Sequence, residues 1–303
     1  MAIDATHVLV DGPWRHRFVA ANGARFHVAE AGEGPLVVLL HGFPQTWWCW
    51  RAQITDLADA GYRVAAMDLR GYGASDKPPR GYDTPTLAAD VAAVVRSLGE
   101  PAAAVVGHDW GAWIAWSMPS LEPAVTRAVA AISMAHPLRL RSALRTSLAQ
   151  VRASSYLLGF QQPVLPERRL VADGAVEHLL RSWGGPGWPA DPELVARYTD
   201  AMRVPFVAHS ACEYFRWVLR SQLRPDGRAF AEAIDRPITV PVLQLHGSVD
   251  PCILPATAEG AQRWVEGELR YAQLEGAGHF LPEERADDVT THLLDWLAKV
   301  HTG

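Results

Sequence analysis

Five residues near the middle of the chain, Gly107-His108-Asp109-Trp110-Gly111, have the spacing of a turn that presents one side chain for chemistry. The arrangement small-x-nucleophile-x-small is that of a nucleophile elbow, where a strand turns sharply into a helix and strains the central residue. An apolar run precedes this turn, and the helix-like run AWIAWSM follows it. Small residues are needed at both flanks because bulkier ones would clash in so tight a turn. The pattern therefore predicts that Asp109 is a nucleophile.

A carboxylate at this position favours a particular reaction. An aspartate is already ionised at neutral pH, so it attacks without help from a base. It can displace oxygen or halide from a saturated carbon and form an alkyl ester with the enzyme, whereas serine suits acyl carbons. A base is needed only afterwards, to activate the water that cleaves the ester. Asp109 therefore indicates epoxides or alkyl halides rather than ordinary esters as substrates.

The segments around the turn alternate between strand-like and helix-like sequence. Helical periodicity over 47–61 and 84–99, the second with Thr84 as expected N-cap, separates short apolar runs that are typical of buried parallel strands. These runs are PLVVLL (35–40), YRVAAM (62–67), AAAVVG (102–107), VAAISM (129–134) and PVLQLH (241–246). The alternation predicts an α/β domain with a mostly parallel sheet. Residues 16–32 predict an antiparallel hairpin that turns at Asn22-Gly23.

The alternation stops after Pro137 and resumes near residue 238. The intervening residues are rich in Arg, Trp and Pro, have helical periodicity in pieces and contain no convincing strand. Open α/β sheets bind ligands beyond the carboxyl ends of their strands, so an insertion of this size suits a helical cap over that edge. We expect a core domain from residues 1–137 and 238–303, and a cap domain from 138–237.

Taken together, the motifs resemble those of α/β-hydrolase-fold enzymes of the epoxide hydrolase and haloalkane dehalogenase group. They are HGFP (41–44), DLRGYGASDKP (68–78), GHDWG (107–111), HGSVD (246–250) and GAGHF (276–280). Their order, with nucleophile before acid before histidine, is also that of the family. The resemblance implies the α/β-hydrolase fold, a mostly parallel eight-stranded sheet flanked by helices and carrying an inserted helical cap.

The resemblance also implies roles for residues outside the elbow. His279, in GAGHF, would be the base of the second half-reaction, and Asp250, in HGSVD, would fix its tautomer and stabilise the imidazolium. The backbone N–H groups of Phe43 and Trp110 would form the oxyanion hole. Epoxide hydrolysis by this scheme uses no cofactor and no metal.

Epoxide hydrolases of this family present two cap tyrosines as proton donors to the epoxide oxygen. Tyr156 stands four residues before a Phe-Gln-x-Pro segment, which is the spacing of the first donor. The second donor usually stands immediately before an arginine, but the run here is Tyr214-Phe215-Arg216. Adjacent helical residues point about 100° apart, so neighbours do not substitute freely. We expect Tyr156 to act, either together with Tyr214 in a shifted register or as a single donor.

The Trp-rich cap suggests a bulky lipophilic epoxide as substrate. The side chains expected to line its pocket are Trp48, Phe160, Trp183 and Phe215. A haloalkane dehalogenase with the same nucleophile is the first alternative, although Phe43 replaces the second halide donor usual in that group. A non-catalytic ligand-binding member of the fold is the second alternative, and a complete triad argues against it.

The composition of the chain excludes some classes of partner and indicates a cellular location. The chain of 303 residues has a formal charge of −5 and no run of Lys or Arg, so nucleic acid is not an expected partner. No apolar run approaches the ~18–20 residues of a membrane span, and no membrane partner is expected. The spacing of Cys49, Cys212 and Cys252 suits neither a metal site nor a disulfide framework. We expect a cytoplasmic enzyme that acts on a small lipophilic epoxide and water, with a homodimer left open.

Overall fold

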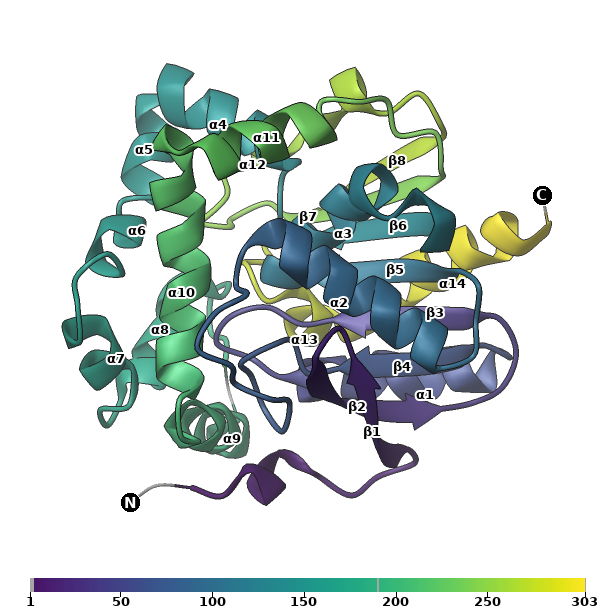
Figure 1. The fold of residues 1–303 in the computed structure, drawn as a ribbon, viewed down its shortest axis with the longest axis horizontal. Coiled ribbons are helices and arrows are strands. Elements are labelled where there is room, and N and C mark those ends of the chain that lie inside the picture. The colour runs from purple at the N-terminus through teal and green to yellow at the C-terminus, as the bar shows by residue number, and fades with distance from the viewer. Residues whose placement is uncertain (1–2, 190, 303) are drawn as a thin grey trace.

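The computed structural model describes residues 3–189 and 191–302 and is built around one eight-stranded sheet (Figure 1). The strand order is β1-β2-β4-β3-β5-β6-β7-β8. Strand β2 pairs antiparallel with β1 and β4, and every other pair is parallel. The predicted mostly parallel α/β sheet is confirmed. The strands are β1 Arg15–Ala21, β2 Ala24–Ala31, β3 Leu36–Leu40, β4 Arg63–Met67, β5 Ala103–His108, β6 Thr126–Ile132, β7 Val242–Gly247 and β8 Leu269–Leu274.

The burial of the central strands explains why their apolar runs were easy to recognise in the sequence. Every residue of β3, β5 and β7 is buried, because helices cover both faces of the sheet. A strand covered on both faces is apolar throughout instead of alternating. The N-terminal hairpin is also confirmed: Asn22 and Gly23 connect β1 to β2 with φ values of 45° and 73°. Positive φ at both positions is the requirement of a tight type I′ turn.

Helices of the core pack on the two faces of the sheet. On one face α2 packs against α3, and on the other α1 packs against α14 (Figure 1). The N-cap of α2 is Asp83, not the expected Thr84, because the Asp83 carboxylate accepts the N–H of Thr86 at 2.9 Å. No helix in the described chain is long and apolar enough to cross a bilayer. The core helices are α1 Arg51–Asp59, α2 Thr84–Ser97, α3 Trp110–Leu121, α12 Pro255–Ala258, α13 Leu281–Glu284 and α14 Ala286–Thr302.

Between β6 and β7 the described residues form helices and no strand, and we call helices α4–α11 the helical insertion. Figure 1 shows the insertion gathered on one side of the sheet. Its hydrogen bonds reach loops that follow the carboxyl ends of β4, β7 and β8: Tyr214 to Arg70, Gln150 to Cys252, and Trp183 to His279. The insertion therefore covers the edge of the sheet where the carboxyl ends of the parallel strands lie. Its helices are α4 Pro137–Thr146, α5 Leu148–Ala153, α6 Tyr156–Gly159, α7 Leu165–Leu170, α8 Ala175–Trp183, α9 Pro192–Arg203, α10 Val207–Arg220 and α11 Pro225–Ile234.

The turn from β5 into α3 depends on two glycines that allow backbones to touch. A Cβ on Gly107 would lie 2.1 Å from backbone atoms of Gly111. A Cβ on Gly111 would lie 2.1 Å from the carbonyl oxygen of Leu40 in β3. Backbone atoms cannot move aside as a flexible side chain can, so both positions exclude any larger residue. This close approach sets the position of the residue at the apex, Asp109.

Replacing Gly111 by alanine is expected to destabilise the protein by about 2–3 kcal/mol or more, because α3 must move away from β3. Gly159→Ala is the matched control, since a Cβ there meets no heavy atom within 4 Å. That control is expected to unfold at the same denaturant concentration as the wild type or slightly above it. Urea unfolding followed by circular dichroism measures both. Equal midpoints for the two variants would contradict the packing argument.

Candidate active site

Asp109 occupies the apex of the turn in a strained backbone conformation, with φ 50° and ψ −114°. Bonds on both sides hold it there. Its N–H donates to the carbonyl of Ile132 at 3.1 Å, and its carbonyl accepts the N–H of Trp113 at 2.9 Å. Such strain persists only where the surroundings over-determine the backbone, and it is concentrated at functional sites. The predicted elbow is present, and it presents a buried carboxylate.

The two carboxylate oxygens of Asp109 have different partners. Oδ1 accepts the backbone N–H of Phe43 at 2.8 Å, and Oδ2 faces Nε2 of His279 at 3.3 Å. Phe43 lies in the loop after β3. Its peptide bond to Pro44 is cis, and the residue is fully buried. One oxygen is therefore held by a main-chain donor, while the other lies beside an imidazole.

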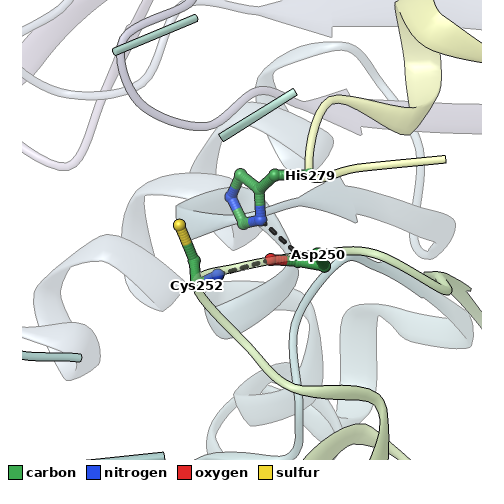
Figure 2. A group of neighbouring side chains, drawn as sticks. All are labelled: Asp250, Cys252 and His279. Atoms are coloured by element: carbon green, nitrogen blue, oxygen red, sulfur yellow. Dashed lines mark hydrogen bonds and ion pairs between the residues drawn. The ribbon is translucent and has the colours of Figure 1, made fainter. Parts of the chain in front are cut away.

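His279 stands between two carboxylates. Its Nδ1 lies 2.8 Å from Oδ2 of Asp250, as the dashed line in Figure 2 marks. The other oxygen of Asp250 accepts the backbone N–H groups of Cys252 at 2.8 Å and Ile253 at 3.1 Å. These bonds fix Asp250 in the loop after β7, so Nε2 of His279 is directed at Asp109. The geometry is that of a nucleophile, a base and an acid that orients the base.

A carboxylate that the sequence did not single out fixes the loop that carries His279. Glu284 accepts the backbone N–H of Gly278 at 2.8 Å and that of Phe280 at 2.7 Å, on both sides of the histidine. It also accepts the N–H of Gly185 in the helical insertion at 2.9 Å. The N–H of His279 donates to the carbonyl of Trp183 at 2.9 Å. The loop that carries His279 is thus tied to the insertion by two hydrogen-bonded links.

A second buried histidine supports the backbone of the first. Nε2 of His108 lies 2.8 Å from the carbonyl oxygen of His279. Burial lowers the pKa of His108 to about 4, so its imidazole is neutral near neutral pH. Because the carbonyl can only accept, the single ring proton of His108 must be on Nε2. His108 therefore helps to hold the loop that carries His279.

The electrostatics of the site favour a charged His279. Burial lowers its pKa, but the charge of Asp250, the hydrogen bonds to Asp109 and Asp250, and the charge of Asp109 outweigh burial and raise the pKa to about 10. Burial likewise raises the pKa of Asp250, and the charge and hydrogen bond of His279 bring it below the usual range. In the free protein the three groups therefore form a buried carboxylate–imidazolium–carboxylate chain.

Aromatic rings pack together beside Phe43, Trp110 and His279, the residues next to Asp109. Phe160 and Phe215 stack at 4.0 Å with an angle of 7°, and Phe215 lies 4.9 Å from Trp110 and 5.1 Å from Phe43. Trp183 lies 5.8 Å from Phe43 and 5.7 Å from His279. The structure thus brings together three of the four residues expected to line the substrate pocket: Phe160, Trp183 and Phe215.

Tyr156 lies in the same cluster, at the start of α6. Its ring is 4.9 Å from Trp183 and 6.2 Å from Phe215. Burial raises its pKa well above the usual value, and the charges of Cys252, Asp109 and Asp250 raise it further. The phenol therefore keeps its proton and remains a donor near the two carboxylates.

Tyr214 is placed differently from the expectation that it acts as a second donor. Its hydroxyl donates to the carbonyl of Arg70 at 2.7 Å, and its ring lies 5.5 Å from Tyr72. The rings of Phe215 and Tyr214 lie 4.9 Å and 5.8 Å from Trp110, but the Tyr214 hydroxyl is directed at the loop after β4. We therefore no longer assign Tyr214 as a proton donor, because its place in the register of α10 commits its hydroxyl to the Arg70 carbonyl.

Trp48 is the second residue that the structure places elsewhere. Its ring lies under the guanidinium groups of Arg51 at 3.9 Å and Arg197 at 4.9 Å, and 6.0 Å from Tyr198. Cation–π contacts hold it at the edge between the core and α9. We therefore remove Trp48 from the residues assigned to the substrate pocket.

Arg216 was not recognised from the sequence as part of the site's framework. It is buried, and its guanidinium donates to the carbonyls of Phe160 at 3.1 Å and Gln162 at 2.7 Å. Its ion pair with Glu167 measures 2.7 Å. Arg216 therefore holds Phe160 against α10 and Phe215. Its position directly after Phe215 in the Tyr-Phe-Arg run was the available signal.

Cys252 is also close to the triad. Its Sγ, a carboxylate oxygen of Asp250 and a ring nitrogen of His279 all lie within 4.8 Å of one another (Figure 2). This is the group within the described residues whose donors could hold a metal ion. Asp250 and His279 already bond to each other, and burial raises the pKa of the Cys252 thiol well above its usual value. Two of these three donors are therefore already bonded to each other.

Comparisons with known proteins agree with this geometry. Residues 35–286 match a family described as alpha/beta hydrolase fold. The chain is 32% identical to epoxide hydrolase A of Mycobacterium tuberculosis, over 93% of this chain and 96% of that protein. It is 34% identical to the AB hydrolase superfamily protein YfhM of Bacillus subtilis, over 93% and 97%. Among solved structures, an epoxide hydrolase from Vigna radiata has a TM-score of 0.81 at 28% identity, covering 95% of this chain and 98% of that one.

The raised pKa of His279 predicts a pH-dependent contribution to stability. A group whose pKa is higher in the folded state stabilises fully below its unfolded pKa of 6.5, and this contribution disappears as the pH rises through about 10. The wild type is therefore expected to lose unfolding free energy between pH 6.5 and 10, by about 1.4 kcal/mol per pH unit, relative to His279→Gln. Urea unfolding at several pH values measures this difference.

His178→Gln on the exposed face of α8 is the matched control and is expected to follow the wild-type pH profile. Parallel pH profiles for the wild type and His279→Gln would show that His279 is not charged in the folded protein.

Proposed function

The chain belongs to the α/β-hydrolase family and is an epoxide hydrolase of that fold, and we propose that it forms a vicinal diol through an alkyl ester on Asp109. The observation that best supports this mechanism is that the two oxygens of the Asp109 carboxylate have different partners. The Phe43 N–H holds Oδ1, while Oδ2 lies beside His279 in a cluster that includes a protonated tyrosine. No cofactor or metal takes part in the scheme.

The first step is an opening of the epoxide ring by the carboxylate. Oδ2 of Asp109 forms a bond to a ring carbon, and the carbon–oxygen bond of the epoxide breaks. The phenol of Tyr156 donates its proton to the departing oxygen, which becomes a hydroxyl group. A positioned acid of this kind typically accelerates a reaction by about 10²–10⁴-fold. The product of this step is a hydroxyalkyl ester on Asp109.

The second step depends on the loss of the Asp109 charge. Esterification removes one of the two negative charges that keep His279 protonated, so the imidazole can give up its proton to the Tyr156 phenolate. His279 then takes a proton from water, and the hydroxide attacks the carboxyl carbon of Asp109. The N–H groups of Phe43 and Trp110 stabilise the oxyanion, and Asp250 stabilises the imidazolium. Collapse of the intermediate releases the diol and restores the carboxylate.

We propose that residues 138–237 form the cap and that Phe160, Trp183 and Phe215 contact the substrate. These rings lie 4.0–5.8 Å from one another or from Phe43, whose N–H binds Asp109, and such an apolar lining suits a lipophilic epoxide. The cysteines Cys49, Cys212 and Cys252 are free and buried, which agrees with a reducing compartment such as the cytoplasm.

Haloalkane dehalogenation is a second candidate because of Trp110. Its indole Nε1 is buried and has no hydrogen-bond partner among the described residues, which would suit a departing halide. Phe43 supplies no second side-chain donor, so a halide would be held less well than in a two-donor site. Bromide release from 1,2-dibromoethane at a rate above epoxide hydrolysis would favour this candidate over the proposed one.

Substituting His279 by glutamine is expected to trap the ester, because alkylation needs no base and hydrolysis does. After incubation with styrene oxide, intact mass spectrometry should show an increase equal to one substrate molecule. Tryptic peptides should place it on Asp109. Asp109→Ala is the control and should remain unmodified. Normal turnover by His279→Gln without an adduct would rule out the mechanism.

The placement of the two tyrosines predicts which one supplies the proton. Tyr156→Phe is expected to slow ester formation by about 10²-fold or more, as measured by stopped-flow tryptophan fluorescence. Tyr214→Phe is the matched control, and its rate should stay within about threefold of the wild type, because its hydroxyl bonds Arg70. Equal losses in both variants would restore Tyr214 to the site.

A further inference from the structure

A hollow of about 460 Å³ lies away from the triad, between α4, the end of α11 and the 3-10 helix Ala261–Trp264. Figure 1 shows α4, α11 and α12 together at one corner of the molecule. No residue that lines the hollow belongs to the catalytic cluster. Its charged lining residues are Arg139, Arg141, Arg145, Arg263 and Asp235.

The four arginines are not balanced by carboxylates. None of them forms an ion pair within the described residues. The lining carboxylate, Asp235, accepts the indole N–H of Trp264 at 2.9 Å. Residues 138–146 on α4 contain three arginines and no carboxylate, in a protein of net charge −5. This corner of the molecule therefore holds concentrated positive charge.

Several contacts give the hollow a defined shape. Arg139 donates to the carbonyl of Ala256 at 2.8 Å and lies so close over Gly260 that a Cβ there would come within 2.1 Å of its Nε. Trp264 forms part of the wall and stacks on buried His136 at 4.5 Å with an angle of 14°. The guanidinium of Arg263 lies 5.3 Å from the Trp264 ring. The arginines are thus arranged around a wall that is itself fixed.

Arg141 lines this hollow and also a smaller one beside Trp113 and Trp217, and it has no anionic partner in either. Its Nε is buried and has no hydrogen-bond partner among the described residues. A buried donor without a partner is costly, and most such groups in native proteins are satisfied. Burial and the charge of Arg145 both lower the pKa of Arg141, as expected for two cations that face one another without an anion.

We propose that this hollow binds the di- or triphosphate group of a small soluble molecule. Guanidinium groups are planar forks that donate paired hydrogen bonds to phosphate oxygens, and several together suit a multiply charged oxyanion. The volume lies within the range of about 300–1,000 Å³ common for small-molecule sites.

The site joins the two parts of the chain. Arg139, Arg141 and Arg145 stand on α4 of the helical insertion, whereas Gly260 and Arg263 belong to the core. A ligand held by both sides links the insertion to the core next to the point where the chain leaves β6. Binding to the folded state alone raises the melting temperature by mass action. The proposal is independent of the catalytic mechanism.

Isothermal titration calorimetry with inorganic pyrophosphate and tripolyphosphate tests the site. The wild type is expected to bind one equivalent, with a rise in melting temperature. The double variant Arg141→Gln/Arg145→Gln should bind at least about tenfold more weakly. Arg263→Gln removes one charge from the core side and should also weaken binding. Arg168→Gln/Arg169→Gln is the matched control, because it removes two arginines of the same insertion that lie outside the hollow.

Three outcomes would overturn the proposal. The first is an absence of binding heat with either probe up to about 5 mM. The second is an equal affinity in the pocket and control double variants, which would indicate a diffuse charge effect. The third is sedimentation with phosphatidylglycerol vesicles in the absence of pyrophosphate binding, which would assign the arginines to lipid headgroups. If the pocket double variant does not fold, Arg263→Gln decides alone, and unchanged affinity in it refutes the site.

Discussion

The chemistry that we propose depends on a single imidazole shared by two buried carboxylates. Asp250 is held by two main-chain N–H groups, and it fixes the ring of His279 so that Nε2 faces Asp109. In the proposed mechanism, the imidazole stays protonated while Asp109 is a carboxylate, and the proton can leave once Asp109 is an ester. The proposed nucleophile would thus control the proposed base through its charge, and the two half-reactions would follow in a fixed order.

The fold supplies this arrangement by bringing strand ends together. Asp109 follows β5, Phe43 follows β3, Asp250 follows β7 and His279 follows β8, and these strands are parallel neighbours or nearly so. Their carboxyl ends therefore meet at one edge of the sheet, where open α/β sheets bind ligands. The close packing of Gly107 and Gly111 sets how far Asp109 projects from that edge. The helical insertion covers the same edge with aromatic rings.

Much of this could be read from the sequence because the signals were local. An apolar strand followed by a tight turn with small flanking residues predicted the elbow, and the Asn22-Gly23 pair predicted the hairpin. The positions of Tyr214 and Trp48 could not be read in this way. Which face of α10 points at Asp109 depends on how the helix packs, and one step of about 100° exchanges Tyr214 for Phe215.

The supporting contacts were less visible still. Glu284 lies five residues after His279, yet its three main-chain bonds exist only because the chain folds back on itself and meets Gly185. Arg216 was adjacent to a recognised motif, but its partners are carbonyls of another helix and loop. Main-chain acceptors and donors leave no trace in residue identity, so the framework of a site is harder to predict than its reacting groups.

The link between Trp183 and His279 has a consequence for how a substrate enters. The carbonyl of Trp183 receives the histidine's own N–H, and Gly185 is anchored to the carboxylate that braces the same loop. Lifting α8 away from the sheet would break these bonds or drag the base out of line with Asp109. If the substrate entered by movement of α8, each opening would break the alignment of His279 with Asp109 that hydrolysis requires. The substrate is therefore expected to enter past other helices of the insertion, while α8 stays in place against the loop of His279.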